Sequence, residues 1–488
     1  MKHVFDGEVT LADRARSPFL YLPFPVPQGA TRLNISYDYS GYMPADQHYG
    51  GNTIDIGLFG PGGTAFGTGD FRGWSGSFRK HITVGLHDAT PAYLPGLPPG
   101  QWNVLLGLYN IAEDGCRYHV EAEVLEGDAG LSTNGLQADT EAAPAGTSAT
   151  SDPPTPPTGP RWFRGDLHCH TFHSDGHSTL KQMTDHARER GLDFLAMTDH
   201  NTVSHHAYLA GLATPTFLPI PGEEITTYFG HANVWGIHQW VDFRCATPED
   251  AARAANLAHQ QGVLFSINHP KYDGPPWLLG TDLDFDCMEV WQAPWWVYNY
   301  ESRALWESLL RQGRRVIAVG GSDLHRVGTP ADPGPYPIGS PTTWVYASGL
   351  TQQEILAGIR QGHVFISADP AGPRVEFTAE TDGRSVMMGD TLAAKPDQAI
   401  TFNVRVHSAR DLILRLIGPG GVLREAPIET DASAYRFPAT SQTLGSGQFP
   451  RPYLRVEVIQ PPEADLDKEP AALIVEAMSN PIWVEMPA

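Results

Sequence analysis

The sequence predicts a three-part architecture, in which an α/β region with parallel strands is flanked by an all-β domain on each side. Short alternating runs of polar and apolar residues, separated by Gly- and Pro-rich turns, fill both ends of the chain, as in antiparallel sandwiches. In the middle of the chain, short apolar runs are each preceded by a helical stretch, which is typical of α/β folds. A chain of 488 residues is long enough for such an arrangement.

The two flanking domains are expected at residues 1–136 and 371–488. In the first, the runs 33–39, 53–59 and 102–109 alternate as strands do, and the second repeats the pattern at 374–377, 400–406 and 453–458. Each domain is therefore predicted to be a β-sandwich, the second one smaller. Between the first of these domains and the central region, residues 137–160 are rich in Ala, Thr, Ser and Pro. This composition cannot bury a core and predicts an extended linker.

In the central region, residues 161–370, several apolar runs end in clusters of potential metal ligands. The run 194–197 is followed by Thr198-Asp199-His200, the run 263–267 by Asn268-His269-Pro270, and the run 315–319 by a segment ending in Ser322-Asp323-Leu324-His325. We interpret each run as a buried strand with its ligands at the carboxyl end. Active sites of α/β barrels lie at that end, so clusters far apart in the sequence can converge.

The segment 162–170 is also expected to be a strand. Alternation would place Asp166, His168 and His170 on one face, with Leu167 and Cys169 in the packing. Two imidazoles two residues apart can hold one ion, and Asp166 would be close enough to orient one of them.

Together these clusters favour a polynuclear metal site. A single histidine on an apolar face is usually a satisfied core residue, but here the ligand types recur in separate clusters that each close an apolar run. Imidazole and carboxylate ligands suit Zn²⁺, Mn²⁺ or Fe²⁺, and the lack of thiolates argues against a closed structural zinc site. Two ions about 3.5–4 Å apart would deprotonate a bridging water and clamp an electrophile, which the residues alone leave open as phosphorus or carbonyl carbon.

Residues 161–370 resemble the PHP (polymerase and histidinol phosphatase) metallohydrolases, and the flanking segments are similar to their carbaryl-hydrolase-like (CehA/McbA) branch. The resemblance implies a distorted seven-stranded β/α barrel with two to three divalent ions. It implies a first ion held by His168, His170, Glu224 and Asp323, a second held by the bridging Glu224 with His231 and His269, and a third held by Asp175, His200 and His325. Glu224 is preferred to the adjacent Glu223 because the family pattern has one residue between Gly222 and the glutamate. Some relatives carry histidine at the position of Asp175.

Other residues near these clusters are candidates for catalysis or substrate binding. Asp323, His325 and Lys271 are the candidate catalytic residues, and Lys271 could contact an anionic substrate or be a solvated loop lysine. Arg72 and Arg79 flank a Gly- and Ser-rich segment that could reach over the barrel mouth to a substrate anion or simply pack the two domains together. Trp295 belongs to an aromatic run that could wall a substrate pocket or fill a core.

Composition excludes several functional classes. The formal net charge of −22, from 33 Lys plus Arg and 55 Asp plus Glu, disfavours nucleic acid as a partner. The four cysteines are widely spaced, which gives no disulfide framework. No signal pattern or long apolar stretch occurs, so we expect no membrane contact and a cytoplasmic protein, with a periplasmic location left open. The sandwiches could mediate homo-oligomerisation.

Three functions follow in order of preference. The first is hydrolysis of small phosphate mono- or diesters by a metal-bridged hydroxide, because three clustered cations match a group with several charged oxygens. The second is hydrolysis of a carbamate or carboxylic ester, which the carbaryl-hydrolase resemblance implies. The third is a non-catalytic carbohydrate-binding protein that keeps the barrel only as a scaffold. It is disfavoured because such a scaffold normally loses its metal ligands, and every expected ligand is present in this sequence.

Overall fold

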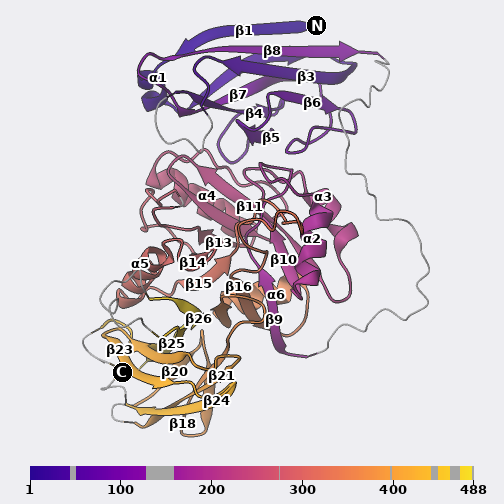
Figure 1. Ribbon diagram of the computed structural model, residues 1–488. Helices are drawn as coiled ribbons and strands as arrows, with labels where there is room; N and C mark the ends of the chain where they lie inside the picture. Colours follow the sequence, from indigo (N-terminus) through magenta and orange to yellow (C-terminus); the bar gives the residue numbers. More distant parts are fainter. Residues whose placement is uncertain are drawn as a thin grey trace, which may run out of the picture.

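The computed structural model shows a mixed α/β protein in which strands outnumber helices (Figure 1). It describes residues 1–43, 51–127, 159–273, 275–395, 398–440, 444, 449–461 and 473–485. Apart from residues 159 and 160, the predicted linker 137–160 lies outside the described residues. The N-terminal sheets, the central α/β region and the C-terminal strands follow one another along the long axis of the molecule.

The N-terminal part forms two four-stranded sheets over one core. The sheets have the orders β1-β8-β3-β6 and β2-β7-β4-β5, with antiparallel neighbours throughout. Buried residues of both sheets, such as Phe24, Leu33 and Val104, belong to one hydrophobic cluster, which is how a sandwich packs. The elements are β1 (Lys2–Val9), α1 (Leu11–Arg16), β2 (Phe19–Val26), β3 (Ala30–Tyr39), β4 (Thr53–Phe59), β5 (Phe71–Gly76), β6 (His81–Gly85), β7 (Gly100–Asn110) and β8 (Cys116–Glu126).

The central region combines parallel and antiparallel strands in the order β15-β14-β13-β12-β11-β10-β9-β16-β17. Strands β9, β10 and β11 are parallel, as are β13, β14 and β15, whereas β12 is antiparallel to both of its neighbours. The elements are β9 (Arg161–Asp166), α2 (Leu180–Glu189), β10 (Phe194–Met197), α3 (His206–Leu209), β11 (Leu218–Thr227), β12 (Gly230–Trp235), α4 (Pro248–Gln260), β13 (Leu264–Ile267), β14 (Cys287–Gln292), α5 (Asn299–Arg311), β15 (Ile317–Gly321), β16 (Thr342–Ala347), α6 (Gln352–Arg360) and β17 (Val364–Ser367).

This sheet curls so that its first strand, β15, approaches β16. The Gly320 amide donates to Thr343 Oγ1 (2.9 Å), which donates in turn to the Gly320 carbonyl (2.7 Å). Beyond the strands, His170 N donates to Leu324 O (2.9 Å) and Asp323 N to His168 O (2.8 Å). The segments after β9 and β15 are thereby paired. A closed seven-stranded barrel stays a prediction, because no continuous ladder joins β15 to β9 or β16 in the described residues.

The C-terminal strands are continuous with the central sheet, which the sequence did not predict. One sheet has the order β19-β18-β21-β24, but the facing strands β26-β25-β22-β23 extend the central sheet through the pairing of β17 with β26. Val375 and Val456, one from each sheet, lie in one core. The elements are β18 (Arg374–Thr381), β19 (Arg384–Met387), β20 (Thr391–Ala393), β21 (Ile400–His407), β22 (Ile413–Gly418), β23 (Gly421–Pro427), β24 (Ala432–Ala439), β25 (Tyr453–Ile459), β26 (Val475–Ser479) and β27 (Ile482–Glu485).

Three helices of the central region, α2, α4 and α6, begin at threonine N-caps. Thr179, Thr247 and Thr351 each accept a hydrogen bond from a backbone N–H in the first turn of α2, α4 and α6. None of the helices in the described ranges is long and apolar enough to cross a membrane.

Candidate metal centre

The first two histidines lie just beyond β9 rather than within it. The strand ends at Asp166, whose carboxylate accepts the N–H groups of His168 (3.1 Å), Ser322 (2.9 Å) and Gly339 (2.8 Å). Asp166 therefore fixes the main chain around the site. Our expectation that it orients an imidazole is wrong, because its oxygens are taken by backbone donors.

The potential ligands converge into four overlapping groups, each with its donor atoms within 4.8 Å of one another. Three of the groups contain the sets that the resemblance implies for three ions. The groups are His168, His170, Glu224 and Asp323; Glu224, His231 and His269; His170, Asp175, His200 and His325; and His168, His269 and Glu289.

Glu224 lies at the centre of the arrangement. Its Oε1 is 3.3 Å from His168 Nε2 and 3.2 Å from both His231 Nδ1 and His269 Nε2, while its Oε2 is 2.8 Å from His200 Nδ1. Glu223 points to the other face of β11, where its carboxylate accepts the Val241 N–H (2.8 Å). The structure thus places Glu224, and not its neighbour, among the imidazoles.

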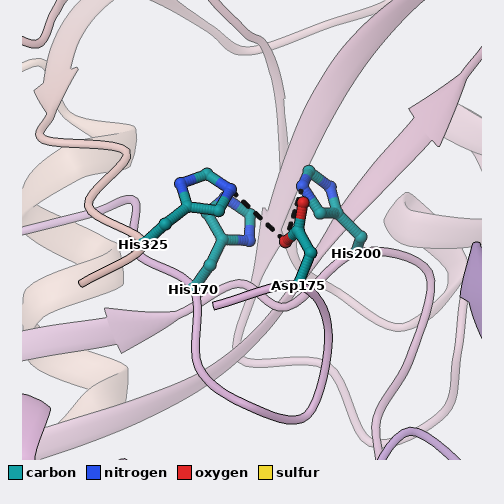
Figure 2. Close-up of side chains that lie close together, drawn as sticks. All are labelled: His170, Asp175, His200 and His325. Carbon is teal, nitrogen blue, oxygen red and sulfur yellow. Dashed lines mark ion pairs between the residues drawn. The ribbon is translucent and has the colours of Figure 1, made fainter. Parts of the chain in front are cut away.

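The third group is the most open to solvent (Figure 2). Asp175 lies between two rings, with Oδ1 at 3.5 Å from His200 Nε2 and 3.3 Å from His325 Nε2. The side chains of Asp175 and His325 are 45% and 36% exposed, whereas those of His170 and Glu224 are fully buried. His325 Nδ1 lies 2.9 Å from the Asp323 carbonyl, which leaves Nε2 to face the group.

Glu289, on β14, is a site residue that the sequence reasoning missed. Its carboxylate lies 2.9 Å from His168 Nδ1 and accepts the His269 N–H (3.1 Å), so it fixes two of the candidate ligands. Gln292, at the end of the same strand, donates to Asp323 Oδ2 (3.0 Å). The available signal was an acidic residue inside an otherwise apolar, fully buried strand.

The carboxylates of the site are held in their charged form. Burial alone would raise the pKa of Asp175, Glu224 and Asp323, but the surrounding histidines outweigh it and lower all three. Burial, together with His200 and His325, lowers the pKa of His170 to about 4, so this imidazole is neutral near pH 7. Ionised carboxylates and a neutral imidazole are the forms that bind cations.

Two other histidines have the opposite shift. Burial alone would lower the pKa of His325, but Asp175 outweighs it and raises the pKa to about 10. The pKa of His168 is likewise raised well above its usual value, because Asp323, Glu289 and Glu224 outweigh its burial. Each is thus surrounded by negative charge that a metal cation can neutralise in place of a proton.

Unsatisfied atoms and strained backbone also fit a bound cation. Buried atoms without a hydrogen-bond partner include Asp175 Oδ1, Glu224 Oε2, His231 Nδ1 and Asp323 Oδ1. Such atoms are rare in proteins without a ligand or ion to satisfy them. His269 and Asp323 adopt positive φ angles of 25° and 55°, which non-glycine residues accept at a cost of about 1–3 kcal/mol. The residues present therefore fit divalent metal ions.

The structure argues against Lys271 as a substrate contact or catalytic group. Its side chain is buried, and Nζ donates to Gln292 O (3.0 Å), Val297 O (2.6 Å) and Asn299 Oδ1 (3.1 Å). An ammonium group has three N–H donors, so none is left for a substrate. Burial lowers the pKa of Lys271 to about 8.

The other candidate substrate contacts are also engaged elsewhere. Arg72 donates to the carbonyls of residues 94–96 within the N-terminal domain. The Trp295 indole donates to Leu473 O (2.6 Å), and its ring packs against Trp291. Arg79 donates to the carbonyls of Phe172 and Ser174, so its segment packs the two domains together, which was the simpler of our two interpretations.

Comparison with known proteins gives one family match, which covers part of the central region. Residues 166–269 match the PHP domain. The PHP segment includes the donors from His168 to His269, whereas Asp323 and His325 lie beyond its end. No curated protein matches the chain significantly.

Several solved structures show distant similarity, each at 17% sequence identity. A two-domain protein from Bacteroides vulgatus that contains a predicted PHP-like metal-dependent phosphoesterase covers 68% of this chain and 100% of its own, with a TM-score of 0.36. An amidohydrolase from Chromobacterium violaceum with bound sulfate and no metal covers 35% and 89%, with a TM-score of 0.26. A protein from Bifidobacterium adolescentis described as a metal-dependent phosphoesterase covers 38% and 93%, with a TM-score of 0.27. At these scores the similarities carry no argument about activity.

Proposed function

We propose that the protein is a metal-dependent hydrolase that acts on small phosphate esters and carries two to three Zn²⁺, Mn²⁺ or Fe²⁺ ions. The observation that carries this proposal is the sharing of donors. Glu224 belongs to two of the donor groups, and His170 links one of these to the open group around Asp175. Shared donors place the candidate ion positions side by side, as a hydrolytic metal cluster requires.

We also propose that the central strands form a barrel that brings these donors together. Strands β9 to β15 would be the seven strands of a distorted barrel. Glu224 lies within β11 and His231 near the start of β12, and the other donors follow strand ends, where the active sites of α/β barrels lie. The match to the PHP domain supports this arrangement for residues 166–269. We further propose, from the flanking segments, that the chain is related to the carbaryl-hydrolase-like branch.

Divalent ions in such groups supply a nucleophile at neutral pH and neutralise charge that develops on the substrate. The protein's own residues set their positions. Asp323 Oδ1 lies 2.9 Å from His170 Nε2, and its Oδ2 accepts from Gln292, so Asp323 is held between the buried and the open groups. We assign His325 to the open group, because the contact of Nδ1 with a carbonyl leaves Nε2 as the nitrogen that can bind a metal ion.

Phosphate is favoured as the electrophile because three adjacent cations match its several charged oxygens. Since Lys271, Arg72 and Arg79 are engaged elsewhere, the charge of a substrate would be balanced by the ions rather than by these side chains. This makes turnover of a charged ester dependent on full metal occupancy.

One observation favours the alternative, an aryl ester or carbamate hydrolase. Tyr272, three residues after His269, is 77% exposed, and its ring lies 5.5 Å from that of Tyr298, while the nearby Trp296 is 75% exposed. Exposed aromatic side chains so close in sequence to a candidate ligand could bind an apolar leaving group.

A substrate panel on the metal-loaded enzyme tests the proposal. Aryl phosphate mono- and diesters are compared with the matched aryl acetate and N-methylcarbamate in one buffer, with and without a chelator. We expect the phosphate esters to turn over fastest, orthophosphate to inhibit competitively, and chelation to abolish activity. A clear preference for the carbamate without inhibition by phosphate would establish the alternative.

A further inference from the structure

All three donors that only the open group uses lie outside the helices and strands, and the N-terminal domain is hydrogen-bonded to the loops that carry or follow two of them, Asp175 and His200. Asp175 lies between β9 and α2, and His200 follows β10. The contacts come from the segment around Arg79 and from the main chain of Ala92, which are far from these loops in sequence. The domains also share a hydrophobic core, in which Trp74 packs against Phe243 with ring centroids 4.7 Å apart.

Arg79 fixes the loop that carries Asp175. Its Nη1 donates to Ser174 O (2.9 Å) and its Nη2 to Phe172 O, so one planar guanidinium holds two carbonyls of the same turn. Asp175 is the next residue along the chain. From the central region, Asp199 holds the same turn by accepting from Thr171 N and Ser174 Oγ (2.8 and 2.7 Å). The turn is therefore held between a carboxylate of the central region and an arginine of the N-terminal domain.

Ala92 fixes the loop that follows His200. Its N–H donates to Ser204 Oγ (3.1 Å), and its carbonyl accepts from Thr202 Oγ1 (2.9 Å). Ser204 Oγ also lies 2.8 Å from His173 Nδ1, which ties this loop to the Asp175 loop. Ala92 is fully buried at a φ of 85°, a strained conformation for a residue with a side chain, which its surroundings must impose.

We propose that the N-terminal domain completes the metal centre, with Arg79 as a positioning residue for the cation held by Asp175, His200 and His325. This inference rests on the proposed metal-dependent function, and it names the part of the protein that controls occupancy of the open position. A loop donor must be ordered when an ion binds, and fixing its backbone costs conformational entropy. The clamp orders Asp175 in advance. Neither Arg79 nor Ala92 is hydrogen-bonded to the buried donors around Glu224, and Glu289 fixes two of these donors, His168 and His269.

The test counts metal ions in the full-length protein. Arg79→Ala and the parent are titrated with Mn²⁺ after removal of all metal, and the binding steps are followed by calorimetry and elemental analysis. Arg72→Ala is the matched control, because Arg72 also donates to carbonyls but only within the N-terminal domain. Thermal unfolding of each variant verifies that it is folded.

We expect three steps in the parent and in Arg72→Ala. In Arg79→Ala the weakest step should lose about 10- to 100-fold in affinity, while the two tighter steps stay unchanged, as is typical when a residue that orients a ligand is removed. Arg79→Lys, which can reach one carbonyl, should lose less. Ser204→Ala should weaken the same step and serves as the test if Arg79→Ala does not fold.

Three results would overturn the inference: a parent with fewer than three steps, equal weakening of all steps in Arg79→Ala, or an unchanged weakest step in both Arg79→Ala and Ser204→Ala. These results differ from a failure of the proposed function. A parent that binds three ions but hydrolyses neither esters nor carbamates would refute the proposed activity and leave the clamp intact.

Discussion

Two substitutions at adjacent positions, Glu224→Gln and Glu223→Gln, compare a candidate metal ligand with a buried glutamate that faces away from the site. Glu224→Gln removes the negative charge from a side chain that faces five imidazoles and accepts a hydrogen bond from Asn268. Removing one partner of a buried charge pair costs about 3–5 kcal/mol. At about 1.4 kcal/mol for each tenfold change, this predicts a loss of roughly 100- to 3,000-fold in metal affinity.

Glu223→Gln is the matched control, since Glu223 is equally buried on the same strand. Among the described residues, its side chain accepts one hydrogen bond, from Val241 N, and an amide oxygen can accept the same bond. Burial raises the pKa of Glu223 well above its usual value, so its surroundings disfavour the negative charge that glutamine lacks. We expect a change in metal affinity of less than about threefold.

Competition with a chromogenic chelator measures both affinities, and thermal unfolding of the metal-free proteins shows whether each variant folds. The reasoning would be refuted by equal affinities in Glu224→Gln and the parent. It would also be refuted by a loss in Glu223→Gln as large as that in Glu224→Gln, because the position of Glu224 among the imidazoles would then have no consequence.

Four other outcomes are expected. Elemental analysis of protein grown with added metal should find two to three transition-metal ions per chain, and less than one would contradict the donor groups. Asp175→Asn should reduce activity less than Glu224→Gln in the same assay, because Asp175 belongs to one donor group and Glu224 to two. Lys271→Ala should lower the unfolding free energy by about 2–4 kcal/mol, measured in urea, because three buried acceptors lose their donor; a change confined to KM would contradict this. Burial raises the pKa of Asp55, which accepts from Tyr228, from 3.8 to about 7. The protonated form therefore stabilises the fold fully below about pH 4, and this contribution is lost as the pH rises to about 7. In thermal unfolding, Asp55→Asn should match the parent near pH 4 and exceed it by about 2–4 kcal/mol near pH 8, and a difference independent of pH would contradict this.

Some of the donors were predictable because they follow apolar strands. The predicted runs 194–197, 263–267 and 315–319 correspond to strands β10, β13 and β15, which span 194–197, 264–267 and 317–321, and His200, His269 and Asp323 follow the strand ends. Strand ends that share one edge of a sheet bring distant residues together, and this needs no knowledge of the loops. Glu224 and His231 lie within β11 and β12, and like Asp175 they were assigned from the family resemblance.

The roles of single polar residues were not predictable. Asp166 and Glu289 are both buried carboxylates on strands, but the first accepts backbone N–H groups while the second faces an imidazole. Lys271 follows a ligand directly, yet its ammonium is directed into the protein. Which partner a side chain finds depends on the packing of segments distant in the sequence. The pairing of β17 with β26 was missed for the same reason. Strand pairing across domains leaves no local signal in the sequence.

The exposure of the donor side chains indicates where solvent reaches the metal centre. His168, His170 and Glu224 are fully buried, whereas exposure increases through Asp323 (17%) to His325 and Asp175. Exchange of an ion and entry of a substrate both require a path to water, and the most exposed donors are those of the open group. Asp175, the most exposed donor, lies on a loop that the N-terminal domain clamps, so a change at that interface acts on the face that a substrate meets before it affects the buried groups.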